Sequence, residues 1–524
     1  MSFAAEDPAA RLTEEEIARG IAVAKRLRVA VFVVAYDAES HIESTLRRIP
    51  SELMRELACV FVIDDQSHDA TFQKAQDVAR EFPQMRVFRT PQNQGYGGNQ
   101  KLGYEYAIRE GFDVVVLLHG DGQYAPEAMP RLLAAFEDDE TSAVFGSRMM
   151  VPGAAKRGGM PFYKRVGNRV LTWLENKLLG SELTEFHSGY RAYRVRSLAE
   201  LPFRYNTNDF HFDTEIIVQL LGKNMKIVEV PIPTYYGDEI CHVNGIAYAA
   251  HCIGTIARYK ANRIYLVHHP KFDLEGDGHY VFKEAPNSLH QAVLDRGVPK
   301  DARVVELGSG HGEVGRSLHD KGAKVVAVDL IKPDATFPFP YLARDLDEPF
   351  AGSVNETQGA RSQLVVALDV IEHLKDPEAS LREIRGLLEP GGRLLASTGN
   401  VAYLPLRFLL FCGMFNYGKK GILDLTHKRL FTTRSFKRTL EGEGFVIDKL
   451  VGFGPPIRDM IGTGWFFGTL DSICGFFARF WPSVFAYQFL VEARARDGLE
   501  DILARTVASG QAGVPTAEPE PHGA

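Results

Sequence analysis

The chain has 524 residues, of which 45% are hydrophobic and 24% charged, with 48 glycines and 27 prolines. This ordinary globular composition excludes collagen, low-complexity disorder and a coiled coil, and the length predicts two large domains or about three smaller ones. The formal net charge of −7 provides no excess of basic residues, so nucleic-acid binding is not expected. The five cysteines form no CxxC pair, which argues against a disulfide framework or a structural zinc site.

The first half of the chain alternates apolar runs with helical patterns. Thr13 and Glu16 form a capping box, which predicts a helix from residue 14 onward. Alternation of this kind predicts a mostly parallel sheet covered by helices on both faces. The predicted strands of this series span residues 28–35, 59–63, 114–118 and 143–146.

Acidic and polar residues follow three of these strands, at 35–39, 64–69 and 119–123. Ligands of open α/β sheets bind beyond the carboxyl ends of the strands. Carboxylates there can hydrogen-bond a base or ribose, and they can hold a hard cation against a diphosphate. Capping of the following helices would explain any one of these positions, but it explains the three together less well.

Eight motifs occur in this half in a fixed order. They are VVAYDAES (33–40), VIDDQSHDAT (62–71), NQGYGGNQKLGYEYA (93–107), HGDGQYAPE (119–127), FGSR (145–148), HSGYRAYR (187–194), FHFDTEI (210–216) and VEVPIPTYYGDE (228–239). Together they resemble the family 2 glycosyltransferases of the GT-A fold, most closely the polyprenyl-phosphate sugar synthases. The resemblance implies inverting, metal-dependent transfer of a sugar from a nucleotide sugar to a glycan or lipid-phosphate acceptor.

The resemblance also implies roles for particular residues. An alcohol acceptor would need a general base, whereas an acceptor phosphate is already ionised and needs only positioning. The implied roles are a nucleotide pocket for Ala35, Tyr36 and Glu39, base contact for Asp65, backbone approach for Gly95, Gly97 and Gly98, Mg²⁺ or Mn²⁺ ligation for Asp121 and Gln123, phosphate binding for Arg148 and Arg191, and a base, if needed, for Asp213 or Glu215.

One position departs from the family pattern. The usual Asp-x-Asp reads His119-Gly120-Asp121 here, so the first carboxylate is missing. Neutral imidazole ligates Mn²⁺ but suits Mg²⁺ poorly. Either His119 only contacts the donor, or Mn²⁺ is favoured.

A turn-rich stretch without periodicity, residues 271–279, separates this series from a second one. We therefore predict two tandem α/β domains with a boundary between about residues 262 and 285. The predicted strands of the second series span 303–307, 324–329, 363–368 and 392–397. The predicted organisation is a helix at 1–27, a first domain at 28–262, a linker at 263–285, a second domain at 286–497 and a disordered tail at 498–524.

The first strand of the second series runs into a turn that carries Gly308, Gly310 and Gly312. Glycines at this spacing let a ligand touch the backbone, and GxGxG differs from the dinucleotide GxGxxG pattern. The next strand ends in Asp329, where an acid can accept hydrogen bonds from both ribose hydroxyls. NAD enzymes share that acid, so the glycine turn and Asp329 alone do not decide between NAD and another ribose-containing cofactor. The remaining motifs decide between these two kinds of cofactor.

Those motifs are ARDLD (343–347), LDVIEHL (368–374) and EPGGR (389–393). With the glycine turn they resemble class I methyltransferases, which have a Rossmann-like fold and use S-adenosylmethionine. The roles implied by this resemblance are the methionine end for Glu306 and the three glycines, the ribose for Asp329, the adenine for Asp345, the mouth of the fourth strand for Asp369, and the acceptor side for Glu372 and His373.

Histidines supply candidate bases for methyl transfer. His373, with an ordinary pKa near about 6.5, can deprotonate a hydroxyl as it attacks the methyl group; alternatively, its segment only starts the next helix. His427, within GILDLTHKRLFT (421–432), is the second candidate, although a lone histidine is more often a buried, hydrogen-bonded residue.

The N-terminus and the two most apolar zones of the chain predict neither a signal peptide nor a spanning helix, as expected of a cytoplasmic protein. The N-terminus lacks a basic region followed by an apolar stretch, so a signal peptide is not expected. The two most apolar zones, 401–415 and 465–491, are interrupted by charged residues and lack the about 20 uninterrupted apolar residues of a spanning helix. The aromatic segment 465–481 is expected to be an interfacial anchor, a lid or ordinary core.

We therefore interpret the chain as a bifunctional glycosyltransferase and methyltransferase that acts on one glycan or glycolipid, in the cytoplasm or at the inner face of the membrane. Fusion would raise the effective concentration of one site's product at the other site. Two alternatives remain. One is a methyltransferase whose first domain has become a glycan- or nucleotide-binding module, which His119 favours; the other is a peripheral membrane scaffold.

Overall fold

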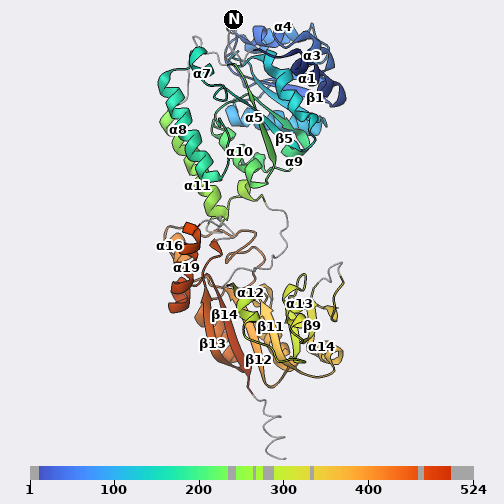
Figure 1. The fold of residues 1–524 in the computed structure, drawn as a ribbon, viewed down its shortest axis with the longest axis vertical. Coiled ribbons are helices and arrows are strands. Elements are labelled where there is room, and N and C mark those ends of the chain that lie inside the picture. The colour runs from blue at the N-terminus through green and yellow to red at the C-terminus, as the bar shows by residue number, and fades with distance from the viewer. Residues whose placement is uncertain are drawn as a thin grey trace, which may run out of the picture. The chain divides into compact units, whose positions relative to one another are not determined.

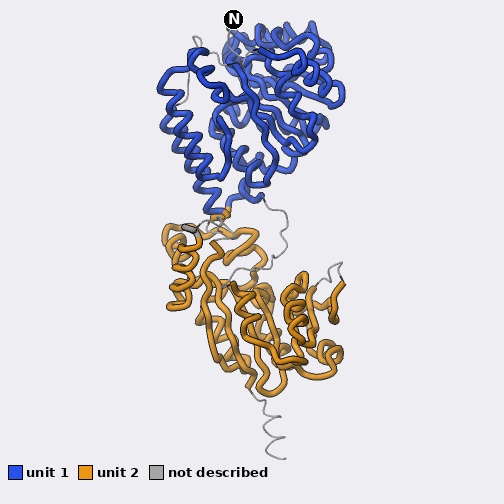
Figure 2. The backbone as a smooth tube through the Cα atoms, in the orientation of Figure 1, with its two compact units in different colours: residues 1–262, 269–276 blue, residues 263–268, 277–524 orange. Residues whose placement is uncertain are grey.

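The computed structural model describes residues 11–233, 244–263, 267–274, 288–330, 336–457 and 465–496. The chain divides into two compact α/β units, residues 1–262 with 269–276, and residues 263–268 with 277–524 (Figures 1 and 2). The predicted fold class of two tandem α/β domains is confirmed. The predicted tail at 498–524, most of the predicted linker, the end of the 228–239 motif and the side chains of 465–467 lie outside the described residues.

The first unit is built on a seven-stranded sheet with the order β3-β2-β1-β4-β6-β5-β7. β6 runs antiparallel to both of its neighbours, and the other pairings are parallel. The four predicted strands are present as β1, β2, β4 and β5, whereas β3, β6 and β7 were not predicted. The strands are β1 (Val29–Ala35), β2 (Cys59–Asp64), β3 (Met85–Arg89), β4 (Val114–His119), β5 (Thr141–Ser147), β6 (Arg191–Arg194) and β7 (Lys226–Pro231).

Helices cover both faces of this sheet, and β1 is buried along its whole length. Its alternate side chains enter separate clusters: Val31 packs in one and Phe32 in the other. Full burial of a side chain such as Phe32 stabilises the fold by about 1.5–3 kcal/mol. The helices are α1 (Glu14–Arg26), α2 (Ile42–Arg47), α3 (Ser51–Glu56), α4 (Thr71–Ala79), α5 (Tyr96–Arg109), α6 (Met129–Ala134), α7 (Ala154–Arg157), α8 (Phe162–Leu179), α9 (Val195–Ala199), α10 (Phe212–Gly222) and α11 (Gly245–Arg263).

The N-terminal helix α1 is part of the first unit. Its predicted capping box is confirmed, because Glu16 N donates to Thr13 Oγ1 at 3.1 Å and Thr13 N donates to Glu16 Oε2 at 2.8 Å. Arg131 on α6 donates to Glu16 Oε1 at 2.8 Å. The buried Val23 joins the sheet's core cluster, so α1 packs as an integral layer of this unit.

The second unit contains a seven-stranded sheet with the order β10-β9-β8-β11-β12-β14-β13. β14 is antiparallel to β12 and β13, and the remaining pairings are parallel. The predicted strands are present as β8, β9, β11 and β12, whereas β10, β13 and β14 were not predicted. The strands are β8 (Arg303–Leu307), β9 (Lys324–Asp329), β10 (Tyr341–Ala343), β11 (Ser362–Leu368), β12 (Leu388–Gly399), β13 (Phe445–Phe453) and β14 (Gln488–Ala495).

The helices of the second unit flank this sheet (Figure 1). They are α12 (Leu289–Leu294), α13 (Glu313–Asp320), α14 (Ala351–Gln358), α15 (Pro377–Leu387), α16 (Leu404–Phe411), α17 (Thr433–Gly442), α19 (Trp465–Phe480) and α20 (Pro482–Phe485). Among the described parts of both units, no helix combines the length and the apolar character needed to cross a membrane.

Candidate functional site

Three predicted ligand-binding segments of the first unit meet at one edge of its sheet. The register pairs Ala35 with Asp64 and Val34 with His119, so β1, β2 and β4 end side by side. Asp65 N then donates to Ala35 O at 2.9 Å, which joins the first two segments directly. The arrangement is the carboxyl-end crevice expected of a parallel α/β sheet.

Asp65 anchors the loop that leads into α5. Its carboxylate accepts hydrogen bonds from Thr90 Oγ1 at 3.0 Å and from the backbone N–H groups of Gln94 and Gly95, both at 2.9 Å. Burial raises the pKa of Asp65, and these hydrogen bonds oppose that shift. A base contact through Asp65 stays a prediction.

Two neighbouring predicted residues, Tyr36 and Glu39, differ in how far contacts with the protein already engage their side chains. Tyr36 is half exposed at the rim, and its ring meets His68 edge-on at a centroid distance of 6.0 Å. Glu39 Oε2 accepts a hydrogen bond from Ala70 N at 3.0 Å, at the start of α4. Tyr36 therefore has an open ring face for a ligand, while Glu39 already holds a turn.

The glycines of the α5 turn pack against protein atoms. A Cβ at Gly97 would lie 2.4 Å from Thr207 O, and one at Gly98 would lie 2.8 Å from Gln94 Cβ. Gly95 precedes them with a φ of +76°, which a side chain would strain. The close approach seen here is thus to the chain's own segment around 207; an approach to a nucleotide stays a prediction.

His119 is held by protein groups at the end of β4. Its Nε2 lies 3.4 Å from Tyr96 Oη, and a Cβ at Gly189 would come within 2.5 Å of the same nitrogen. Burial lowers the pKa of His119, which favours the neutral imidazole. Asp121 Oδ1 accepts a hydrogen bond from Gln123 N at 3.0 Å, so one carboxylate and one amide side chain share this loop. Oxygen donors of this kind suit a hard cation.

Asp213 lies in the first turn of α10, next to Tyr96, the residue that contacts His119. It accepts hydrogen bonds from Tyr96 Oη at 2.9 Å and from Gln100 Nε2 at 3.2 Å. Its Oδ1 also lies 3.5 Å from Arg191 Nη1. The predicted base is therefore a buried acceptor in a network that spans α5, α10 and β6.

Arg191 has a structural role that differs from the predicted phosphate contact. The side chain is only 1% exposed, and it donates to three backbone carbonyls, those of Phe186, Ser188 and Asp213, at 2.7–3.1 Å. Its guanidinium also stacks 4.8 Å from the Phe145 ring centroid. Because its donors are used internally, Arg191 supports the loop that precedes β6.

Two further predicted residues are ion-paired. Arg148 pairs with the buried Glu185; although burial alone would raise the pKa of Glu185, Arg148 holds it below its usual value. Glu215 is fully buried and lies 2.5 Å from Lys271 Nζ, a residue of the predicted linker. The charge of Glu215 is thus neutralised by Lys271, and its role as a base, if one is needed, stays a prediction.

A basic cavity of about 170 Å³ opens beside Arg148, between α7 and α8. The buried Nε of Arg165 has no hydrogen-bond partner there. This cavity was not predicted from the sequence, although several basic residues occur among the apolar residues of α8. The lining includes four cations, Arg148, Lys156, Arg165 and Arg169.

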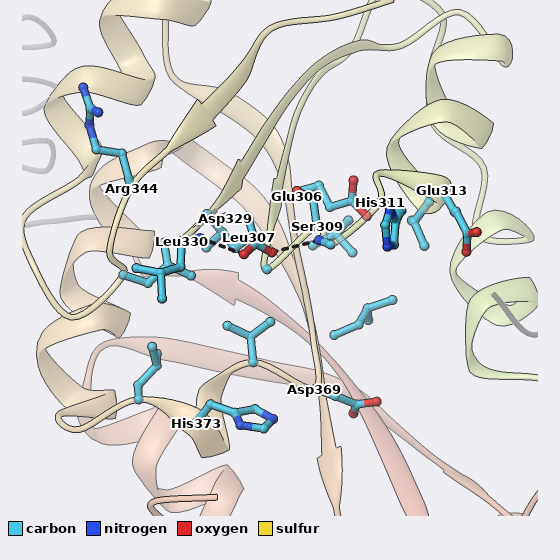
Figure 3. A pocket seen from close by; sticks show the side chains of 18 of the residues that line it. Glu306, Leu307, Ser309, His311, Glu313, Asp329, Leu330, Arg344, Asp369 and His373 are labelled. Atoms are coloured by element: carbon cyan, nitrogen blue, oxygen red, sulfur yellow. Dashed lines mark hydrogen bonds between the residues drawn. The ribbon is translucent and has the colours of Figure 1, made fainter. Parts of the chain in front are cut away.

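The second unit contains a cavity of about 400 Å³ at the carboxyl ends of its strands (Figure 3). Glu306 and Asp329 lie on one side of it, and Asp369 and His373 lie across from them. Gly312 and Glu372 are predicted residues that do not line the cavity. Gly312 precedes α13 in a left-handed conformation. The predicted residues that line the cavity are Glu306, Gly308, Gly310, Asp329, Asp345, Asp369 and His373.

Hydrogen bonds fix the glycine turn and the acid that follows β9. Gly310 N donates to Asp329 Oδ2 at 2.8 Å, and Leu330 N donates to Asp329 Oδ1 at 2.7 Å. Gly308 has a φ of +64°, and a Cβ there would lie 2.3 Å from Val370 Cγ2. Only glycine fits this position without displacing the cavity floor.

Asp345 and Asp369 also line the cavity, and hydrogen bonds hold both side chains. Asp345 Oδ1 accepts a hydrogen bond from Asp347 N at 2.9 Å. Asp369 has a φ of +54°, and its Oδ1 accepts from Ser397 Oγ at 2.8 Å and from Gln488 Nε2 at 2.5 Å. Gln488 begins β14, so the unpredicted last strand orients this carboxylate.

Hydrogen bonds determine which nitrogen of His373 carries its proton. Thr426 Oγ1 donates to Asp424 Oδ1 at 2.7 Å, because an ionised carboxylate only accepts. The hydroxyl has one proton, so it must accept from His373 Nδ1, which lies 3.0 Å away. His373 Nε2 is left with its lone pair, as a general base requires.

The other two predicted acceptor-side residues are less open. His427 Nδ1 lies 3.0 Å from Ile422 O, and burial lowers the pKa of His427. Glu372 is 2% exposed and does not line the cavity, so its position on the acceptor side stays a prediction. Burial, together with the nearby Asp369 carboxylate, raises the pKa of Glu372 to about 8.

Glu306→Gln is expected to change how the stability of the ligand-free second unit depends on pH. Burial raises the pKa of Glu306 from 4.5 to about 8, against a hydrogen bond from Gly315 N. Between these values the folded state holds a proton that the unfolded state has lost, so the free energy of unfolding falls as pH rises. The neighbouring carboxylates of Asp329 and Glu313 act in the same direction.

Thermal and denaturant unfolding of both proteins at about pH 5 and about pH 8.5 measures this effect. The variant should gain on the order of 2–4 kcal/mol over the parent at the higher pH and little at the lower one. Glu372 titrates in both proteins, so the difference between them isolates Glu306. Equal pH slopes would show that Glu306 is ionised throughout.

Comparison with known proteins finds a family match in each unit. Residues 30–201 match the family described as glycosyl transferase family 2, and residues 278–450 match a methyltransferase domain family. The chain is similar to an undecaprenyl-phosphate mannosyltransferase of Micrococcus luteus, with 30% identity over 39% of this chain and 83% of the relative. It is also similar to a ubiquinone biosynthesis O-methyltransferase of Aeromonas salmonicida, with 25% identity over 34% of this chain and 78% of the relative.

A solved structure gives a further likeness. Glucosyl-3-phosphoglycerate synthase of M. tuberculosis is 18% identical and covers 48% of this chain and 85% of its own, with a TM-score of 0.37.

Proposed function

Because the chain belongs to glycosyl transferase family 2 and carries a methyltransferase domain in its second unit, we propose that it transfers a sugar from a nucleotide sugar to a lipid-phosphate acceptor and methylates a hydroxyl of a related glycan. The enzyme therefore has two sites, one in each unit. We place it at the cytoplasmic face of a membrane, in the synthesis of a cell-surface glycolipid or polysaccharide.

The observation that carries the lipid-phosphate acceptor is the basic cavity beside an exposed apolar face. Four cations line the cavity, and the same helix, α8, exposes large apolar side chains. Phe162, Tyr163 and Trp173 are 72%, 70% and 60% exposed. Cations beside an apolar helix face fit an amphiphile with a phosphate head and a hydrocarbon chain.

The acceptor phosphate would attack the anomeric carbon as its bond to the nucleoside diphosphate breaks, and one displacement inverts the configuration. The ionised phosphate needs no base, which agrees with the engagement of Asp213 and Glu215 inside the protein. Asp121 and Gln123 would hold a divalent cation whose charge stabilises the leaving diphosphate.

Arg165→Ala combined with Arg169→Ala is expected to raise the KM for polyprenyl phosphate by about 10–100-fold per lost contact, because a hydrogen bond to a charged group contributes about 1.5–3 kcal/mol. The KM for the nucleotide sugar should stay unchanged. Lys177→Ala is the matched control, since Lys177 lies on the same helix over Trp173 and outside the cavity. An unchanged KM for polyprenyl phosphate would contradict the binding of this acceptor in the basic cavity.

For methyl transfer, the cavity of the second unit would hold S-adenosylmethionine, with Glu306 and Gly308 at the methionine end and Asp329 at the ribose. The acceptor oxygen would attack the methyl group while His373 Nε2 takes its proton. Thr426 and Asp424 would position the imidazole in the required tautomer. The second unit also exposes Phe411 on α16 and Phe480 on α19, which supports contact with a membrane surface.

A second candidate function rests on His119. Since its Nε2 faces Tyr96 and Gly189, Asp121 is the nearest carboxylate left for a cation in this loop. One carboxylate binds a cation more weakly than two, which favours a first unit that binds a nucleotide or glycan without catalysis. Loss of sugar transfer in Asp121→Asn distinguishes the two functions.

A further inference from the structure

A buried cluster in the first unit lies outside both proposed sites. It joins Glu175 on α8, His187 in the segment before β6 and Cys252 on α11. One ligand-type atom from each residue lies within 4.8 Å of the other two. Glu175 and Cys252 are fully buried, and the His187 side chain is 11% exposed.

The cluster contains polar atoms without partners. Both carboxylate oxygens of Glu175 and Nε2 of His187 lack a hydrogen bond. Nε2 lies 3.1 Å from Glu175 Oε2, yet the two groups are not in hydrogen-bonding geometry. A buried carboxylate with no hydrogen bond costs several kcal/mol unless a cation compensates its charge.

We propose that Glu175, His187 and Cys252 bind a divalent cation of the zinc class. Oxygen, imidazole nitrogen and sulfur together suit zinc, whereas Mg²⁺ and Ca²⁺ take all-oxygen sets. Donors around a tetrahedral zinc ion lie roughly 3.5 Å apart, so these atoms need only small shifts to reach one ion. A carboxylate and a thiolate also neutralise its double charge inside the protein.

Surrounding hydrogen bonds orient two of the ligands. Tyr248 Oη lies 3.1 Å from His187 Nδ1, and Thr214 Oγ1 donates to Cys252 Sγ at 3.2 Å. Partners of this kind fix the orientation of metal-bound side chains. A bound cation would stabilise the thiolate of Cys252, which is the form in which cysteine ligates a metal.

The ion would act as a clamp on the sugar-transfer unit. It would tie α8 and α11 to the segment 187–191, whose Gly189 packs against His119. The lack of a CxxC pair does not exclude this zinc site, since one thiol is enough when the other ligands come from distant segments. The open fourth position would take water, as in zinc sites with three protein ligands.

Metal analysis of the full chain tests this site. Protein purified without chelator and dialysed into metal-free buffer should retain about one zinc per chain, and Cys252→Ser should retain less than about a tenth of that. Cys59→Ser is the matched control, because Cys59 is also buried but lies on β2, outside the cluster. Asp121→Asn controls for a cation on the donor side. Both controls should keep their zinc.

Cobalt(II) added to the zinc-free parent provides a readout that needs no variant. A thiolate-to-cobalt absorption band should appear in the near ultraviolet, and the sulfur-free pair Asp121 and Gln123 does not generate it. Zinc lost only in Cys252→Ser, together with this band, supports the site. A parent without zinc that gives no band, or zinc that survives Cys252→Ser, overturns it.

Discussion

Asp121→Asn is expected to lower the rate of sugar transfer by about 10²–10³-fold. Asp121 supplies the carboxylate of its loop, and a cation held there would stabilise the leaving diphosphate by several kcal/mol. The loop has no second carboxylate to replace Asp121, because His119 occupies that position. The Nε2 atom of His119 faces Tyr96 and Gly189. Initial rates with a nucleotide sugar, polyprenyl phosphate and Mn²⁺ measure the effect.

The control for this variant is Asp77→Asn, a surface carboxylate on α4 that pairs with Arg80. It should transfer sugar at the parent rate, and S-adenosylmethionine should bind the parent and both variants equally. Sugar transfer that is equal in the parent and in Asp121→Asn would contradict a catalytic cation at Asp121. Absence of sugar transfer in the parent itself would leave the first unit as a binding module.

His373→Gln should lower the rate of methyl transfer by about 10²–10⁴-fold, the usual contribution of a general base. Binding of S-adenosylmethionine should persist, because the hydrogen bonds that hold Asp329 and the glycine turn do not involve His373. Initial rates of methyl transfer from S-adenosylmethionine, compared between the parent and the variant at saturating S-adenosylmethionine, measure the effect.

Two further variants locate the base. Thr426→Val keeps the side-chain shape but removes the hydroxyl that accepts from His373, so it should lower kcat and change the pH profile. His427→Gln should have the smaller effect, because His427 is only partly exposed and its Nδ1 lies 3.0 Å from Ile422 O. A larger loss in His427→Gln than in His373→Gln would reverse the assignment.

The strands that could be predicted are those with strong apolar runs. β1 and β8 are buried on both faces and read as continuous Val-rich segments, so their positions follow from composition. β6 has only four residues, two of them buried arginines, and carries no apolar pattern. β14 lies between β12 and β13 by long-range pairing, which no local pattern reveals.

The site residues divide in the same way, into those that local sequence patterns predict and those that depend on contacts with distant segments. Glycines and acids at strand ends could be located because turn chemistry and sheet topology are local properties. Partners distant in sequence could not: Lys271 neutralises Glu215 across 56 positions, and Thr426 reaches His373 across 53. These contacts change the chemistry, turning one predicted base into an ion pair and fixing the tautomer of the other.

One measurement tests the central claim that a single chain performs two successive modifications. Full-length protein would be incubated with polyprenyl phosphate in vesicles, S-adenosylmethionine labelled in its methyl group, and a panel of nucleotide sugars carrying a second label. We predict one lipid-phase product that contains both labels. Labels that enter separate products, or a lipid phase without sugar label for every nucleotide sugar, would contradict it.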